Sequence, residues 1–257
     1  MGVQPATRVP RGEAHLLLAV LLALAAGGWL LLIWQARSAG DDAMTLTMGM
    51  KAPLFLATWV VMMAAMMLPA AAPMVLTYAR VQASKRERGQ SSVPTWVFVG
   101  AYLLLWTAVG ALLYAGAVGA DALLSRSMAG MEDLPRFGGG LIALAGAYQF
   151  SPVKRLCLRK CRSPLDFVLH HWRDGYAGSF RMGFRHATYC VGCCWLLFVV
   201  LFPLGIMNIA AMAVLTLLIT VEKVTTVTRQ TENAVAGALI VYGLLVVAIP
   251  ALLPTVL

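Results

Sequence analysis

The sequence predicts an all-α protein, a polytopic helical membrane bundle of about seven transmembrane helices with its N-terminus inside and its C-terminus outside. Three observations lead to this prediction. First, 60% of the 257 residues are hydrophobic, 12% are charged and the mean hydropathy is +0.79, whereas a soluble domain carries about 25% charged residues. Second, apolar stretches long enough for membrane helices, which need about 20 residues, recur along the chain. Third, lysines and arginines gather in two of the connecting loops.

Seven apolar segments with short connections fill the chain. They lie at 15–34, 54–78, 95–119, 137–153, 187–203, 206–222 and 234–253. The first follows Arg8 and Arg11 and is longer than the core of a signal peptide, so we interpret it as a retained helix, with a cleaved signal peptide as the alternative. The fourth is short and glycine-rich, which suits a helix packed closely inside the bundle or a re-entrant segment.

The basic loops give the predicted orientation. Loop 79–94 and segment 154–185 are strongly basic, and the positive-inside rule places both on the cytoplasmic side. This placement requires segment 137–153 to span, and it puts 16 of the 20 lysines and arginines inside. Topology therefore explains the net charge of +9, and nucleic acid is not expected as a partner. We expect one integral membrane domain over 1–257, surrounded by the lipid bilayer.

Segment 154–185 is the one sizeable piece expected outside the membrane, as a basic cytoplasmic segment. The stretch SPLDFVLHHW within it predicts a short interfacial helix. Its apolar side chains Phe167, Val168 and Trp172 are expected to lie in the headgroup region.

Cysteine and histidine form the most distinctive pattern of the sequence, in HATYCVGCCW. On a helix, His186, Cys190 and Cys194 follow one another at four-residue intervals. Cys193 lies three residues after Cys190, so all four side chains share one face of that helix. Three cysteines with one histidine form a ligand set for a soft metal ion. Copper as Cu(I) is the favoured ion, and zinc is the alternative, because this set is also common in structural zinc sites.

A second pair, Cys157 and Cys161, lies in the basic segment on the same predicted side of the membrane. The two groups of cysteines are therefore expected to converge in one shallow layer. A thiolate neutralises the single charge of Cu(I), which lowers the cost of holding the ion near hydrocarbon. Neighbouring cations are expected to lower the pKa values of these thiols and so favour the metal-binding form. These cations are Lys154, Arg155, Arg159, Lys160 and Arg185.

Methionines form a second sulfur-rich stretch near the middle of the second apolar segment. They are Met62, Met63, Met66 and Met67. Thioethers are soft, neutral ligands, so these side chains fit an intramembrane relay for Cu(I). Methionine is equally an ordinary gap-filler of packed helices, which is the alternative interpretation. Pro69 and Pro73 follow closely and are expected to kink the helix.

Glu222 ends the sixth apolar segment and is followed directly by Lys223. A carboxylate at the end of a membrane helix is retained for pairing or for function. Two interpretations follow. Glu222 is either a functional carboxylate of the metal site or an ion-pair partner of Lys223, with both side chains extending to the interface.

Four stretches together resemble a family of bacterial integral membrane proteins described as predicted metal-binding, formerly a domain of unknown function. They are WVVMMAAMMLPAAAPM, GAYQFSPVKRLCLRKCRSP, MGFRHATYCVGCCW, and GIMNIAAM followed by Glu222–Lys223. That family includes a membrane copper chaperone serving a tyrosinase-type polyphenol oxidase. The resemblance implies a metal-binding core at 55–225, with the first and last helices outside it. It also implies copper bound by the cysteines in a multi-pass protein of the bacterial inner membrane.

The preferred hypothesis is a Cu(I)-binding membrane protein, not an enzyme. It would pass copper to a partner copper enzyme, exchange it with a soluble copper carrier or move it across the bilayer. A membrane thiol–disulfide oxidoreductase using Cys190 and Cys193 is the first alternative, because CxxC is also a dithiol redox motif. A structural membrane subunit, in which the sulfur serves only packing, is the second.

Overall fold

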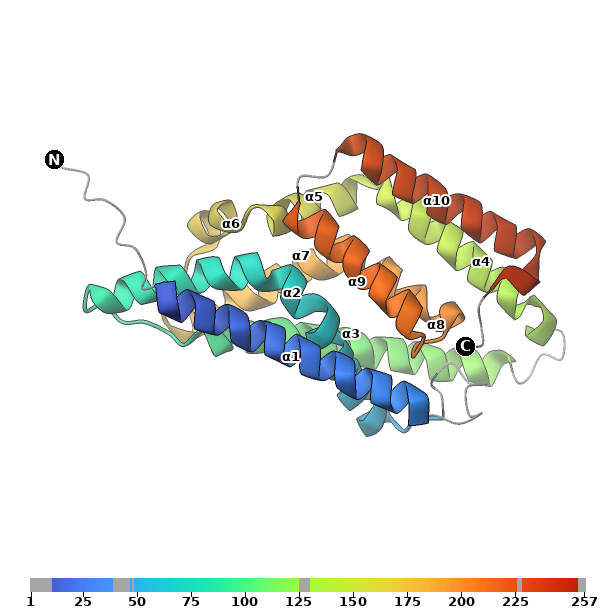
Figure 1. Ribbon diagram of the computed structural model, residues 1–257, viewed down its shortest axis with the longest axis horizontal. Helices are drawn as coiled ribbons and strands as arrows, with labels where there is room; N and C mark the ends of the chain where they lie inside the picture. The colour runs from blue at the N-terminus through green and yellow to red at the C-terminus, as the bar shows by residue number, and fades with distance from the viewer. Residues whose placement is uncertain (1–10, 39–46, 48, 125–129, 226–227, 254–257) are drawn as a thin grey trace.

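The computed structural model describes residues 11–38, 47, 49–124, 130–225 and 228–253. Within these residues all regular structure is helical, which confirms the predicted all-α class (Figure 1). The elements in chain order are α1 (Arg11–Ser38), α2 (Ala52–Glu87), α3 (Thr95–Leu124), α4 (Gly130–Gln149), α5 (Pro152–Arg162), α6 (Pro164–His171), α7 (Gly175–Val199), α8 (Leu201–Leu204), α9 (Ile209–Val224), α10 (Arg229–Ala248) and the 3₁₀ helix η2 (Pro250–Leu252).

Each of the seven predicted apolar segments corresponds to a helix. Among the described residues, five helical stretches are long and apolar enough to cross a membrane, and they contain α1, α2, α3, α7 with α8, and α10. The helices α4 and α9 do not meet this criterion. The 16 residues of α9 extend about 24 Å, less than the roughly 30 Å of a bilayer core. The structure thus supports a helical membrane protein, with five of the predicted spans recognisable from length and composition alone.

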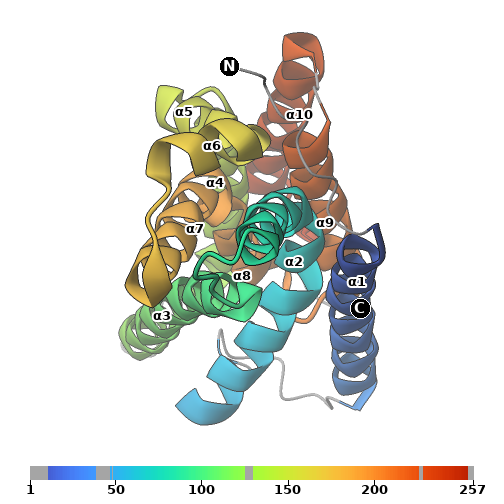
Figure 2. The same cartoon turned by 90° about the vertical axis from the view of Figure 1, so that its left-hand side faces the viewer.

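The helix α2 is the centre of the bundle. It contacts α1, α3, α6 and α9, and Figure 2 shows it between α1 and the neighbouring pair α3 and α7. Its helix continues through Pro69 and Pro73. Trp59 anchors it to α3 by donating its indole N–H to the carbonyl oxygen of Trp106 at 2.8 Å. The sulfur-rich part of α2 is therefore held inside the protein, away from lipid.

Ion pairs bring several helix ends together at one end of the bundle. Arg86, near the end of α2, binds Glu13, near the start of α1, at 2.6 Å. Lys85 pairs with Asp174, the residue directly before α7. The start of α1, the end of α2 and the start of α7 therefore lie together. We call the end that holds these two ion pairs the basic end.

The remaining helix ends are joined to the basic end through α5 and α6. Lys154 of α5 binds Glu222, near the end of α9, at 2.7 Å. Arg162, the last residue of α5, binds Glu232, in the first turn of α10, at 2.8 Å. Since α5 and α6 lead directly to Asp174, the end of α9 and the start of α10 also face the basic end.

The short helix α6 was predicted at the right place but with the wrong face toward lipid. Phe167 and Val168 are buried in the core and do not lie in a headgroup layer. Phe167 packs its ring edge-on against His186 of α7, with 5.6 Å between ring centroids. The exposed apolar side chains are Leu165 and Leu169. The helix therefore turns its aromatic face toward α7 because that neighbour offers aromatic partners.

Glycines let α4 and α10 pack backbone against backbone. A Cβ on Gly146 of α4 would lie 2.8 Å from the carbonyl oxygen of Ala236, and one on Gly243 of α10 would lie 2.4 Å from the nitrogen of Ala143. Small residues allow this close approach between membrane helices. The glycine-rich fourth segment is thus part of a continuous helix that packs closely against α10.

Neighbouring glycines on α4 test this packing. A valine at Gly139 would place its Cβ 2.7 Å from the carbonyl oxygen of Gly243, whereas nothing lies within 4 Å of a Cβ at Gly140. We expect Gly139→Val to lower the free energy of unfolding by about 1–3 kcal/mol through overpacking. Gly140→Val is the matched control and should have little effect. Thermal unfolding in detergent measures both, and equal losses would contradict the packing described.

Candidate metal centre

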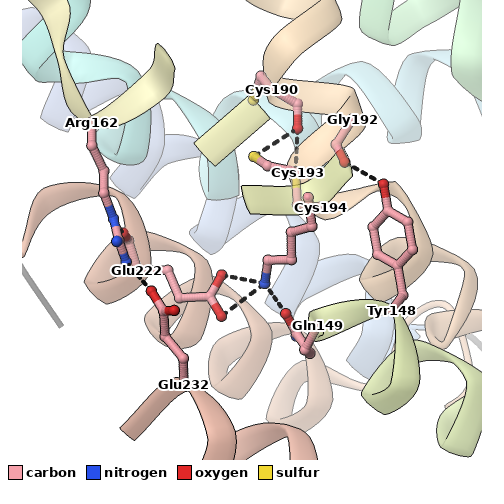
Figure 3. Close-up of polar contacts among 10 residues, drawn as sticks. Tyr148, Gln149, Arg162, Cys190, Gly192, Cys193, Cys194, Glu222 and Glu232 are labelled. Carbon is pink, nitrogen blue, oxygen red and sulfur yellow. Dashed lines mark hydrogen bonds and ion pairs between the residues drawn. The ribbon is translucent and has the colours of Figure 1, made fainter. Parts of the chain in front are cut away.

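The three cysteines of α7 form the core of a buried sulfur cluster. Their helical spacing brings the thiols of Cys193 and Cys194 back toward the preceding turn. Both donate hydrogen bonds to the carbonyl oxygen of Cys190, at 3.1 and 2.9 Å (Figure 3). All three side chains are buried. The prediction that they share one face of a helix is confirmed.

The second cysteine pair approaches this cluster from α5. Cys161 is buried, and its thiol lies close enough to that of Cys193 for the two to interact. Cys157 packs directly on Gly192, where an added Cβ would lie 2.6 Å from its sulfur atom. Tyr148 supports the same turn by donating a hydrogen bond to the carbonyl oxygen of Gly192 at 2.6 Å (Figure 3). The expected convergence of the two cysteine groups is therefore present in the structure.

The expectation that nearby basic residues lower the pKa values of the α5 thiols is wrong. Burial raises the pKa of the Cys157 thiol. The hydrogen bond with Cys193, together with burial, raises the pKa of the Cys161 thiol well above its usual value. Two of the expected cations are paired with carboxylates instead: Lys154 binds Glu222 at 2.7 Å, and Lys160 binds an oxygen of Asp166 at 3.0 Å. Desolvation thus outweighs the positive charge around these thiols.

Lys223 is a member of the sulfur cluster that its place at the end of an apolar segment did not predict. Its side-chain nitrogen lies 2.8 Å from the sulfur of Cys190 and 3.9 Å from the sulfur of Met67. The hydroxyl group of Tyr102, on α3, lies 3.0 Å from the same Cys190 sulfur. Lys223 is only 6% exposed. Side chains from α2, α3, α7 and α9 therefore meet at Cys190.

Methionine sulfur reaches the cluster from α2. Met62, Met63, Met66 and Met67 are all buried. Met67 contacts the nitrogen of Lys223, which lies against Cys190. The other three methionines belong to the hydrophobic core around α2. The structure therefore brings one of the four predicted relay methionines to the thiols and packs the others in the core.

His186 lies one turn before Cys190 in a pocket of aromatic rings. Its ring stacks between those of Phe98 and Tyr102, at centroid distances of 5.9 and 5.8 Å. The side chain is buried, and Nδ1 has no hydrogen-bond partner among the described residues. An unpartnered buried nitrogen on the same face as the thiols has the chemistry of a further ligand.

Glu222 is ion-paired, but its partner is not the one expected from the sequence. Its carboxylate binds Lys154 at 2.7 and 2.9 Å, and Lys154 also donates to the side-chain oxygen of Gln149 (Figure 3). Arg162 donates to the backbone oxygen of Glu222. Glu222 and Lys223 are both buried and turn to different partners, so they do not extend together to the interface as an end-of-helix pair.

The donor set of this centre is rich in soft sulfur. All five cysteines are free thiols. In the part of the chain that the structure describes, no three side chains of His, Cys, Asp or Glu form a ready-made ligand set for one ion. The thiols of Cys193 and Cys194 instead donate to a backbone carbonyl group, and the sulfur of Cys190 accepts a hydrogen bond from Lys223. The arrangement fits a soft ion that binds as these contacts are exchanged for metal–sulfur bonds.

The sequence comparison identifies the family of this chain. Residues 56–246 match the family described as "PpoB2: Copper chaperone". The match extends beyond the expected core of 55–225 and includes most of α10, so the expectation that the last helix lies outside the family was wrong. No curated protein and no solved structure matches the chain. Because the match covers well over half of the sequence, the chain belongs to the PpoB2 copper chaperone family.

Proposed function

We propose that this protein is a Cu(I) chaperone of the bacterial inner membrane, which supplies copper to a partner copper enzyme. The observation that carries this proposal is the buried sulfur cluster, in which thiols from α5 and α7 lie together and Lys223 connects them to a thioether from α2. Such a donor set is suited to Cu(I) and poorly suited to hard cations. Membership of a copper chaperone family agrees with copper as the cargo. The partner enzyme and the +1 oxidation state of copper are parts of the proposal.

We further propose seven transmembrane helices, with the N-terminus inside and the C-terminus outside. The support comes from the basic end, where the start of α1, the end of α2 and the start of α7 lie together. The end of α9 and the start of α10 face the same way. Loop 79–94 and segment 154–185 belong to this end and carry most of the basic charge. The positive-inside rule then assigns the basic end to the cytoplasm.

Copper is proposed to move along a line of sulfur atoms. Cys157 is the least buried of the five thiols and receives the ion at the basic end. Cys161 lies close to Cys193, and Cys193 donates a hydrogen bond to the carbonyl oxygen of Cys190, so they hold the ion next. Met67 follows beyond Cys190. Each step exchanges one sulfur ligand for a neighbouring one, and Cys194 and His186 complete the site.

Copper binding by the α7 cysteines tests the proposed function. Purified protein loaded with Cu(I) is expected to show sulfur-dominated coordination by X-ray absorption spectroscopy. Simultaneous replacement of Cys190, Cys193 and Cys194 by serine should abolish this signal, because hydroxyl groups are hard ligands. Met62→Leu is the matched control, since it removes a buried sulfur atom of the α2 core and should leave binding intact. Tight binding of Cu(I) by the triple variant would refute the proposed site.

A further inference from the structure

A buried lysine in contact with sulfur is the most unusual feature of the cluster. The nitrogen of Lys223 contacts the thiol sulfur of Cys190 and the thioether of Met67, at 2.8 and 3.9 Å. Both sulfur atoms belong to the proposed copper path. The ammonium group therefore occupies the space between the last thiol of that path and the first thioether.

No carboxylate among the described residues forms an ion pair with Lys223. Glu222, the adjacent residue, is held by Lys154 through two contacts, at 2.7 and 2.9 Å. A buried ammonium group is costly unless it is paired. The groups around Lys223 that accept its hydrogen bonds are the sulfur atoms of Cys190 and Met67. The sulfur cluster thus already holds one positive charge before any metal ion binds.

We propose that Lys223 is the internal monovalent cation of the empty site, and that copper binding exchanges its ammonium group for one Cu(I) ion. This inference rests on the proposed function and adds a selectivity mechanism to it. In this exchange the ammonium group carries one positive charge out of the site as Cu(I) brings one in, and each thiol that binds the ion as a thiolate releases its proton to solvent at the basic end. A divalent ion such as Zn(II) brings in one positive charge more than the ammonium group carries out. Lys223 therefore favours monovalent soft ions over divalent ones.

The position of Lys223 on α9 offers a place for the displaced ammonium group. Lys223 lies in the last turn of α9, whose C-terminal carbonyl groups attract cations. This turn faces the basic end, where Glu222 is tied to α5. A long, flexible lysine side chain can turn from the cluster toward the carbonyl groups at that end of its own helix. Displacement then needs no movement of the helices.

Affinity measurements on two variants test the proposal. Lys223→Leu and Lys223→Gln remove the charge and add no sulfur ligand. We expect each variant to bind Cu(I) at least about tenfold more tightly, because the ammonium group of Lys223 no longer competes with the ion for the sulfur atoms or repels it. Any positive charge that stays nearby repels a divalent ion more strongly than a monovalent one, so the gain for Zn(II) should exceed that for Cu(I). Competition with chromophoric chelators measures both ions, and Lys85→Met is the charge-matched control distant from sulfur.

Chemical labelling of the wild-type protein gives a second measurement that does not depend on folding of the variants. In the empty protein, Lys223 and Lys154 are both buried and should resist an amine-acetylating reagent. Cu(I) loading should expose Lys223 to acetylation, as measured by peptide mass spectrometry. Lys154 remains bound to Glu222 and serves as the internal control.

The outcomes separate the inference from the function on which it rests. If the wild-type protein does not bind Cu(I), the proposed function fails. If it binds Cu(I) but both Lys223 variants fold and show equal or weaker affinity, the displacement of Lys223 is wrong while the copper site stands. Protection of Lys223 from acetylation in the loaded protein would overturn the displacement in the same way.

Discussion

Replacement of Glu222 by alanine is expected to destabilise the protein by about 3–5 kcal/mol, because it leaves the ammonium group of Lys154 buried without a counter-charge. Lys154 and Glu222 are 3% and 6% exposed, and their charged groups make two contacts. The pair also connects α5, which carries two cysteines, to α9, which carries Lys223. Chemical denaturation in detergent micelles measures the loss.

Two further variants separate pairing from metal binding. The double variant Lys154→Met with Glu222→Leu removes both charges and should recover most of the lost stability, since an apolar pair of similar volume often replaces a buried ion pair without cost. Glu232→Ala breaks the more exposed ion pair with Arg162 and should cost less. If the double variant binds Cu(I) like the wild type, Glu222 acts as an ion-pair partner. Loss of copper binding in that stable variant would make it a ligand.

The helices were predictable because hydrophobicity reports the membrane environment directly. The fourth segment shows where this signal weakens. Only its glycine content indicated close packing, and the structure explains it through Gly146 and Gly243, which bring α4 against the backbone of α10. The sequence of α6 likewise predicted a helix, but not that Phe167 would face α7. Which face of a short helix is buried depends on the helices that pack against it, and the sequence pattern of the short helix does not identify them.

The cysteine cluster was predictable from helical spacing and from charge. Spacings of three and four residues placed Cys190, Cys193 and Cys194 on one face, and the positive-inside rule placed Cys157 and Cys161 on the same side. The proximity of Cys161 to Cys193 agrees with both arguments.

Lys223 was harder to find, because a lysine at the end of a membrane helix is normally expected to extend to the interface. The available signal was the adjacent Glu222. Glu222 and Lys223 are adjacent and both buried, so they turn to different partners when they do not pair with each other. Here Glu222 pairs with Lys154, and Lys223 contacts Cys190. The packing of α5 against α9 therefore decides where Lys223 lies, and this packing is a property of the fold.

Cys193→Ala is expected to weaken Cu(I) binding by at least about a hundredfold, above the range for loss of a supporting contact around a metal site. Cys193 is the thiol that contacts both Cys161 of α5 and Cys190 of α7. Its removal therefore separates the two halves of the cluster. Equilibrium competition with a chromophoric Cu(I) chelator measures the loss.

Cys157→Ser, unlike Cys193→Ala, should change the rate of copper uptake more than the affinity for copper. Cys157 is half-buried at the outer side of the cluster, so its loss should slow the uptake of Cu(I) from a donor while reducing the final affinity by less than about tenfold. Stopped-flow transfer from a thiol-bound Cu(I) donor separates rate from affinity. A Cys157→Ser variant that loads as fast as the wild type would show that copper reaches Cys161 and Cys193 by another route. A hundredfold loss of affinity would instead make Cys157 a ligand of the main site.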